Sequence, residues 1–190
     1  CLDLCDMLVY IYRALGIPCG IEELPMRGNN NAPHFWNFLV DQHGQTWYFS
    51  MFYWWHRLLK AEVYADVYGK VFRQRFSLNR DMMDSLRMPL DSVHPVFRYP
   101  FFEDVTRLYA TDKAFTLSVG KQHLARDIRA GEVVYICMSD RYAWKPVGWT
   151  RYDGSNAVFK DCHGGTIYCL AVYDAANDKL APVSSPFSVG

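Results

Sequence analysis

The sequence lacks several features that would place it in a common functional class. It has no net charge, with 20 Lys and Arg against 20 Asp and Glu in 190 residues, so a basic surface for nucleic acid is not expected. Its apolar runs stay far below the ~20 residues that a membrane-spanning helix needs. It has no Cys-x-x-Cys motif, internal repeat or low-complexity tract. These absences argue against nucleic-acid binding, a membrane span and a thiolate zinc site.

Metal and disulfide chemistry have weak support. The six cysteines are Cys1, Cys5, Cys19, Cys137, Cys162 and Cys169. Cys162 and Cys169 flank a short segment and could pair across a hairpin, but spacing alone does not fix disulfide geometry. The histidines have no partners at metal-ligand spacing, and we expect His43 in a turn and His56, His94, His123 and His163 on the surface. The sequence therefore predicts no metal site and no cofactor, and leaves the redox compartment open.

The chain opens with a helical pattern over residues 2–15. Two apolar lines run along it, which is typical of a buried helix. Arg13 in the last turn, Gly16 after it and Pro18 beyond it predict where the helix ends. Cys1 is therefore predicted to lie at the N-terminal end of a central helix.

The segments after this helix alternate between loop and strand patterns. Residues 23–33 contain Gly, Pro and three consecutive Asn, which predicts a loop. Residues 34–41 and 46–54 are predicted to be strands joined by a turn at Gly44. Residues 57–68 fit a short helix and 70–78 another strand, on whose solvated face we expect Lys70, Arg73 and Arg75.

The second half of the chain is rich in short strand patterns. Prolines interrupt residues 88–104, which predicts a linker. The strands expected beyond it are 114–119, 132–138, 143–149, 156–161 and 166–173. Their spacing and the turns between them are typical of a β-sandwich.

Cys1 and His34 are the candidate catalytic pair. A thiol at a helix N-terminus is more easily ionised because the helix dipole stabilises the thiolate, which is the nucleophile. A nucleophile also needs a base, and His34 opens the strand that follows the Asn-rich loop. We therefore expect the helix end and the strand end to bring Cys1 and His34 together.

These residues also resemble a known family. Cys1 and Asp3, then the Arg-Ala-Leu-Gly-Ile-Pro segment at residues 13–18, then His34, Trp36 and Asn37 on a strand, resemble the transglutaminase-like superfamily. The Gly44–Trp47 spacing belongs to the same pattern, which covers about residues 1–54. Segments of the second half more weakly resemble the β-rich region that follows this domain in some secreted bacterial members.

The resemblance implies a fold and a domain division. The fold is α+β: a papain-like transglutaminase core, with a central helix packed on an antiparallel sheet, followed by an all-β sandwich domain. Residues 1–90 would form the first domain, without its N-terminal elements, and residues 96–190 the second.

The sequence departs from the family at the third catalytic position. Where the family has an aspartate that orients the histidine, this chain has Ser50, which carries no charge. Asp41, Asp66 and Asn37 are the local alternatives, and nothing in the sequence selects among them. Ser50 can share a sheet face with His34 only if the preceding hairpin loop has three or five residues.

The resemblance implies cysteine-dependent acyl transfer on protein or peptide amides, by transamidation or hydrolysis. Cys1, His34 and Ser50 would be catalytic, and Trp36 and Asn37 would contact the substrate. The alternative is a catalytically degenerate module that binds a protein, a glycan or a cell-surface partner. A secreted, periplasmic or cell-surface location is implied by the resemblance alone.

Overall fold

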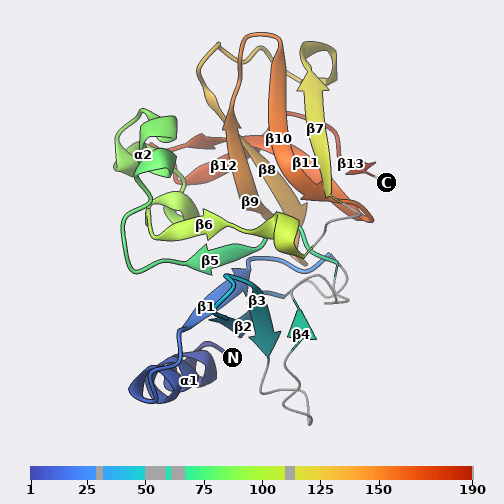
Figure 1. The fold of residues 1–190 in the computed structure, drawn as a ribbon. Coiled ribbons are helices and arrows are strands. Elements are labelled where there is room, and N and C mark those ends of the chain that lie inside the picture. Colours follow the sequence, from blue (N-terminus) through green and yellow to red (C-terminus); the bar gives the residue numbers. More distant parts are fainter. Residues whose placement is uncertain (29–31, 50–58, 61–66, 110–113, 190) are drawn as a thin grey trace.

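The computed structural model describes residues 1–28, 32–49, 59–60, 67–109 and 114–189. It is a mixed α+β structure composed mostly of β-sheet (Figure 1). No helix in these ranges is long and apolar enough to cross a membrane.

A six-stranded antiparallel sheet organises the first half of the chain, in the order β4-β3-β2-β1-β5-β6. Its strands are β1 (Cys19–Leu24), β2 (His34–Val40), β3 (Thr46–Phe49), β4 (Leu59–Lys60), β5 (Phe72–Gln74) and β6 (Phe102–Asp104). The predicted strands at 34–41 and 46–54 are confirmed over β2 and β3. Residues 50–54 lie outside the described residues.

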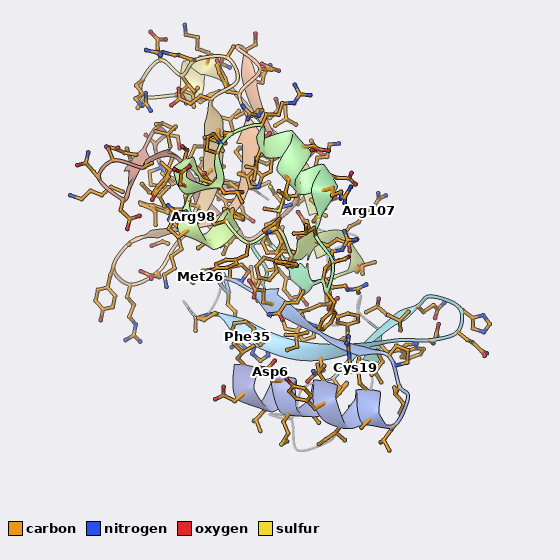
Figure 2. All side chains as sticks on the ribbon, turned by 90° about the vertical axis from the view of Figure 1, so that its left-hand side faces the viewer. Asp6, Cys19, Met26, Phe35, Arg98 and Arg107 are labelled. Atoms are coloured by element: carbon orange, nitrogen blue, oxygen red, sulfur yellow. The ribbon has the colours of Figure 1, made fainter. Side chains whose placement is uncertain are left out.

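Helix α1 (Leu2–Ala14) lies against one face of β1 and β2, as Figure 2 shows. The predicted helix and its end are confirmed, and Gly16 has the positive φ of 77° that glycine adopts without strain. The prediction that the helix is buried is wrong. Cys5, Leu8 and Val9 are buried against the sheet and Tyr12 is partly buried beside them, while Tyr10 is 78% exposed.

Three local predictions in this half are wrong. Glu23 and Leu24, assigned to a loop, belong to β1, because β1 bonds to β2 on one side and to β5 on the other. Leu59–Lys60, assigned to a helix, forms β4 because it bonds to the backbone of β3. The segment 88–104 is no plain linker: it contains the 3-10 helices η2 (Leu90–Ser92) and η3 (Pro95–Phe97), and then β6.

The second half forms two sheets. One pairs β7 (Ala114–Gly120) with β10 (Asn156–His163). The other has the order β12-β11-β8-β9, with β13 also paired to β11. Its strands are β8 (Val133–Ser139), β9 (Trp144–Arg151), β11 (Thr166–Asp174), β12 (Lys179–Pro182) and β13 (Phe187–Val189).

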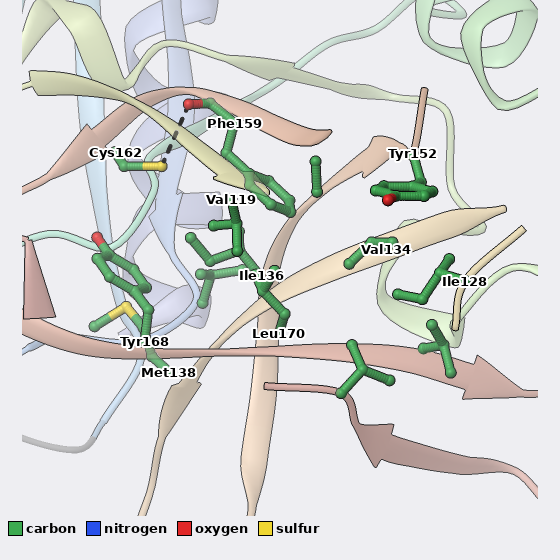
Figure 3. Packing of buried hydrophobic residues seen from close by; sticks show 14 of the residues in the cluster. Val119, Ile128, Val134, Ile136, Met138, Tyr152, Phe159, Cys162, Tyr168 and Leu170 are labelled. Atoms are coloured by element: carbon green, nitrogen blue, oxygen red, sulfur yellow. Dashed lines mark hydrogen bonds between the residues drawn. The ribbon is translucent and has the colours of Figure 1, made fainter. Parts of the chain in front are cut away.

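Each predicted strand of the second half is confirmed, and the sheets pack in a sandwich-like arrangement. Residues of β7 and β10 contact residues of β8 and β11 in one core, shown in Figure 3. That figure labels Val119, Ile136, Phe159 and Leu170 among its members. The opposite face of β8 is covered by α2 (Arg80–Leu86) and the 3-10 helices that follow it. Because both faces are covered, six of the seven residues of β8 are buried.

Residues after 96 also complete the first sheet. Strand β6 pairs with β5 at its edge, and Val105 and Tyr109 belong to the apolar cluster around Trp36. The turn that leads into η4 (Thr106–Leu108) is held by the Thr106 hydroxyl, which accepts from the Val71 N–H at 2.9 Å. The division into domains at residues 90 and 96 stays a prediction.

Candidate active site

The structure brings Cys1 and His34 together although 33 residues separate them in sequence. Cys1 is the N-cap residue of α1, and His34 is the first residue of β2. Their Sγ and Nδ1 atoms are 3.5 Å apart, within hydrogen-bonding distance for sulfur. The Cys1 thiol also lies 3.7 Å from the Phe35 carbonyl oxygen.

Several polar contacts fix the position of α1 on the sheet. Near the C-terminal end of the helix, Arg13 Nε donates to the Cys19 carbonyl at 2.9 Å. Near its start, Asn37 Nδ2 donates to the Cys5 carbonyl at 3.0 Å and to the Gly20 carbonyl at 3.3 Å. The helix therefore runs antiparallel to β1, and its first residue is held beside the start of β2.

The two side chains have different access to solvent. Cys1 is exposed, whereas His34 is only 5% exposed. Sulfur at a helix N-terminus and next to an imidazole is in the environment that favours a thiolate. An exposed thiol with a sheltered base beside it is suited to nucleophilic attack on an added substrate.

A buried polar cluster lies behind His34. The His34 ring is 5.6 Å from the Trp36 ring, and Trp36 Nε1 donates to Glu22 Oε2 at 3.0 Å. Arg73 bonds to Glu22 Oε1 through Nε at 2.8 Å and Nη2 at 2.6 Å, while the Tyr109 hydroxyl bonds to Oε2. This cluster fixes the indole against which the imidazole packs.

Electrostatics within this cluster are dominated by burial. Burial raises the pKa of Glu22, and the Arg73 guanidinium opposes that rise. Burial and the Glu22 carboxylate together raise the pKa of Tyr109 well above its usual range. The expectation that Arg73 lies on a solvated strand face is wrong, because it pairs with a glutamate that is fully buried.

The two residues predicted to contact substrate are both buried. Trp36 is 0% exposed and Asn37 1%, and the polar groups of both bond within the protein. In this structure their visible role is to position His34 and α1. A contact with substrate stays a prediction.

The candidates for the third catalytic residue divide into two groups. Ser50 and Asp66 lie outside the described residues. Asp41 is engaged in the β2–β3 hairpin, where its oxygens accept from the His43 and Gln45 N–H groups and from the Trp47 indole. The Trp47 hydrogen bond is the main reason that the pKa of Asp41 is lowered. The loop between Val40 and Thr46 has five residues, one of the lengths that the sequence argument for Ser50 requires.

Other predicted features of the histidines and cysteines were tested by the fold. His163 is 4% exposed and packs edge-on against Tyr68, so its prediction as a surface residue is wrong. His94 is half-buried between Tyr135 and Tyr173, His123 is exposed, and His56 lies outside the described residues.

All six cysteines are free thiols, including Cys162 and Cys169. Within the described ranges, no group of His, Cys, Asp and Glu side chains could hold a metal ion.

Sequence reasoning missed Glu22 and Tyr109. Neither belongs to a motif, and Tyr109 reaches Glu22 across 87 residues, so local pattern carries no signal for the contact.

The chain matches no protein-family model, no curated protein and no solved structure. The structure alone describes the protein: it is a mixed α+β chain in which an exposed cysteine at a helix N-terminus lies beside a buried histidine.

Proposed function

We propose that this protein catalyses cysteine-dependent acyl transfer on the amide groups of proteins or peptides. The observation that carries the proposal is the 3.5 Å separation between Cys1 Sγ and His34 Nδ1 at the N-terminus of α1. A thiol and an imidazole in this arrangement form the dyad of cysteine acyltransferases and peptidases. The resemblance of the Cys1, Arg13–Pro18 and His34–Asn37 segments to the transglutaminase-like superfamily supports the same chemistry and a papain-like arrangement of helix and sheet.

The proposed reaction has two steps. His34 takes the thiol proton, and the Cys1 thiolate attacks the amide carbonyl carbon. The carbon–nitrogen bond breaks, His34 gives its proton to the leaving amine, and a thioester remains on Cys1. An amine then attacks the thioester to give a new amide, or water attacks to give an acid, and the thiol is restored.

The first turn of α1 would stabilise the negative charge that develops on the carbonyl oxygen of the amide when the thiolate attacks. Backbone N–H groups in the first turn of a helix have no acceptor within the helix. They point past the N-terminus, where Cys1 lies, and stabilise anions there. Ser50 is the sequence candidate for orienting His34.

The alternative is a degenerate module that binds a protein or glycan without turnover. The observation that favours it is the uncharged serine at the third position, since removal of the aspartate charge from a triad costs about 10⁴-fold in rate. Secretion or display at the cell surface is part of either proposal and depends on the resemblance alone.

Hydroxylamine trapping separates the two functions. The protein is incubated with a glutamine-containing donor peptide and hydroxylamine, which converts a thioester into a hydroxamate that is detected by mass spectrometry. We expect hydroxamate from the unmodified chain, and none from Cys1→Ala or His34→Ala. Asp84→Asn, in an exposed part of α2, is the control. Peptide binding without hydroxamate across a panel of donor peptides would support the binding module.

A further inference from the structure

A pocket of about 420 Å³ lies between strands of the first and second halves, and neither Cys1 nor His34 lines it. Strands β5 and β6 form one wall, and β9 and β10 form the other. Figure 1 shows β5 and β6 passing next to β9. Five aromatic side chains line it: Phe72, Phe97, Phe102, Trp149 and Phe159.

Two consecutive glutamates of β1 have different environments because side chains alternate across a strand. Glu22 faces Arg73, Trp36 and Tyr109, where its charge is paired. Glu23 points to the opposite face and lines the pocket. Burial raises the pKa of Glu23, and a hydrogen bond from the neutral Gln74 amide only partly offsets that rise. A cation that entered the pocket would therefore stabilise the Glu23 carboxylate.

The aromatic rings around Glu23 also favour a cation. The Phe72 ring is 6.2 Å from the Phe97 ring and 6.3 Å from the Phe102 ring, centroid to centroid, so the three form one cluster. The faces of such rings attract organic cations through the negative potential of the ring. A carboxylate next to an aromatic cluster is the combination that recognises an ammonium group.

The other charges of the pocket agree with this chemistry. Among the described residues, its lining carries four carboxylates, Glu23, Asp81, Glu103 and Asp104, and three cationic side chains, Lys70, Arg75 and Lys160. Lys70 Nζ is already bonded to Asp104 at 2.7 Å and to the Lys160 carbonyl oxygen. The described lining residues thus carry one more carboxylate than cationic groups.

One row of paired residues in the sheet leads from the dyad to the pocket. Phe35 pairs with Glu23, Glu23 with Phe72, and Phe72 with Asp104. Cys1 Sγ lies 3.7 Å from the Phe35 carbonyl oxygen. Because neighbouring strands are about 5 Å apart, Phe72 lies about 10 Å from Phe35 along this row. That distance is within the reach of one peptide substrate.

We propose that this pocket binds a primary ammonium group of a peptide, held by the Glu23 carboxylate and the faces of Phe72 and Phe102. The bound group anchors the substrate away from the scissile amide. The assignment as a substrate subsite rests on the proposed function, whereas binding of the ammonium group does not.

Calorimetric titration of the Cys1→Ala chain tests binding without turnover. The probes are Nα-acetyl-lysine methylamide for a side-chain ammonium, leucine amide for an amino terminus, acetyl-norleucine methylamide as the neutral analogue and acetyl-glutamate methylamide as the anion. We expect one of the two ammonium probes to bind at least tenfold more tightly than the neutral and anionic probes. The stronger ammonium probe identifies the source of the group.

Two substitutions locate the site. We expect Glu23→Gln to weaken binding of the ammonium probe at least tenfold, and Phe102→Leu to weaken it by a smaller factor. Asp84→Asn, which removes the same charge from outside the pocket, should leave the affinity unchanged. Tighter binding of the anionic probe, equal binding of the neutral probe, no binding of any probe, or an unchanged affinity in Glu23→Gln would each overturn the proposal.

This test is independent of hydroxamate formation. Ammonium binding without hydroxamate would keep the pocket and refute the acyl-transfer function. Hydroxamate formation without ammonium binding would support the acyl-transfer function and refute the ammonium-binding pocket.

Discussion

At the scale of single residues, the cysteines occupy very different environments. Cys1 is exposed beside His34, whereas Cys5, Cys19 and Cys162 are buried and burial raises the pKa of each thiol to about 11. The pKa of the Cys137 thiol is also raised by burial. Reactivity towards alkylating agents follows the fraction of accessible thiolate, so these differences predict selective labelling.

We predict that iodoacetamide at pH 7 labels Cys1 before any other cysteine of the folded protein. The buried thiols are neutral at this pH and have no access to the reagent. Peptide mapping by mass spectrometry after a short reaction would measure the site of labelling. Equal labelling of Cys1 and Cys5 would contradict the packing of α1.

Glu23 provides a prediction about pH. Its pKa in the folded protein lies above the ordinary value of 4.5, so between these two values the folded state binds more protons than the unfolded state. The stabilising contribution of protonated Glu23 is therefore present below pH 4.5 and is lost as the pH rises through the folded-state pKa.

Glu23→Gln should remove this loss of folding stability at higher pH. Urea unfolding at pH 4.5 and pH 7.5 should show that the variant gains free energy of unfolding relative to the unmodified chain at the higher pH. For the control Asp84→Asn, the free energy of unfolding should differ from that of the unmodified chain by the same amount at both pH values. A variant that loses stability at pH 7.5 would show that the Glu23 carboxylate stabilises the folded state, and would contradict this account.

At the scale of elements, the cluster behind β2 positions His34 through Trp36. Glu22 in β1 and Arg73 in β5 form a bidentate pair between neighbouring strands, and Glu22 also accepts from Trp36. Because Glu22 is fully buried, removal of its charge leaves Arg73, which is largely buried, without compensation.

We predict that Glu22→Gln destabilises the protein by about 3–5 kcal/mol, the cost of breaking a buried ion pair. The measurement is the free energy of unfolding in urea. Glu22→Gln combined with Arg73→Met should cost less than the sum of the two single changes, because the double variant leaves no uncompensated charge. Additive losses would show that the two side chains do not interact.

Sequence patterns predicted those elements whose local signal is strong. Residues 2–15 have helical periodicity with a clear end, and the predicted strands of the second half are short segments rich in apolar residues and separated by turn signals. The pairing of Cys1 with His34 followed from a helix end next to a strand end. Strands β4 and β6 have two and three residues, and they exist because a neighbouring strand supplies hydrogen-bonding partners. Such strands carry no pattern of their own.

At the scale of the whole molecule, Lys70 connects the six-stranded sheet of the first half to the β7–β10 sheet of the second half. Its ammonium bonds to Asp104 in β6 and to the Lys160 carbonyl in β10, although its side chain is only 6% exposed. The sequence placed Lys70 on a solvated face, and that prediction is wrong. Its partners are 34 and 90 residues away, so only the assembled fold identifies them.

We predict that Lys70→Met lowers the free energy of unfolding by about 1.5–3 kcal/mol, the range for hydrogen bonds to charged groups. Asp104 is 38% exposed and can regain water, which limits the loss. Lys121→Met is the matched control, because the pair of Lys121 with Asp127 is exposed. Thermal unfolding should show a lower Tm for the first variant only. Equal Tm values for both would mean that Lys70 does not stabilise the junction.

The central claim is that Cys1 and His34 form a working dyad, and the pH dependence of Cys1 alkylation tests it most directly. The rate of iodoacetamide labelling at Cys1 is measured from pH 4 to pH 10 in the unmodified chain and in His34→Ala, with Asp84→Asn as the control. The account predicts that labelling is half-maximal at a pH well below about 8.5, the value for a free thiol, and that His34→Ala moves this midpoint upward. A midpoint near that of a free thiol, unchanged when His34 is removed, would contradict the account.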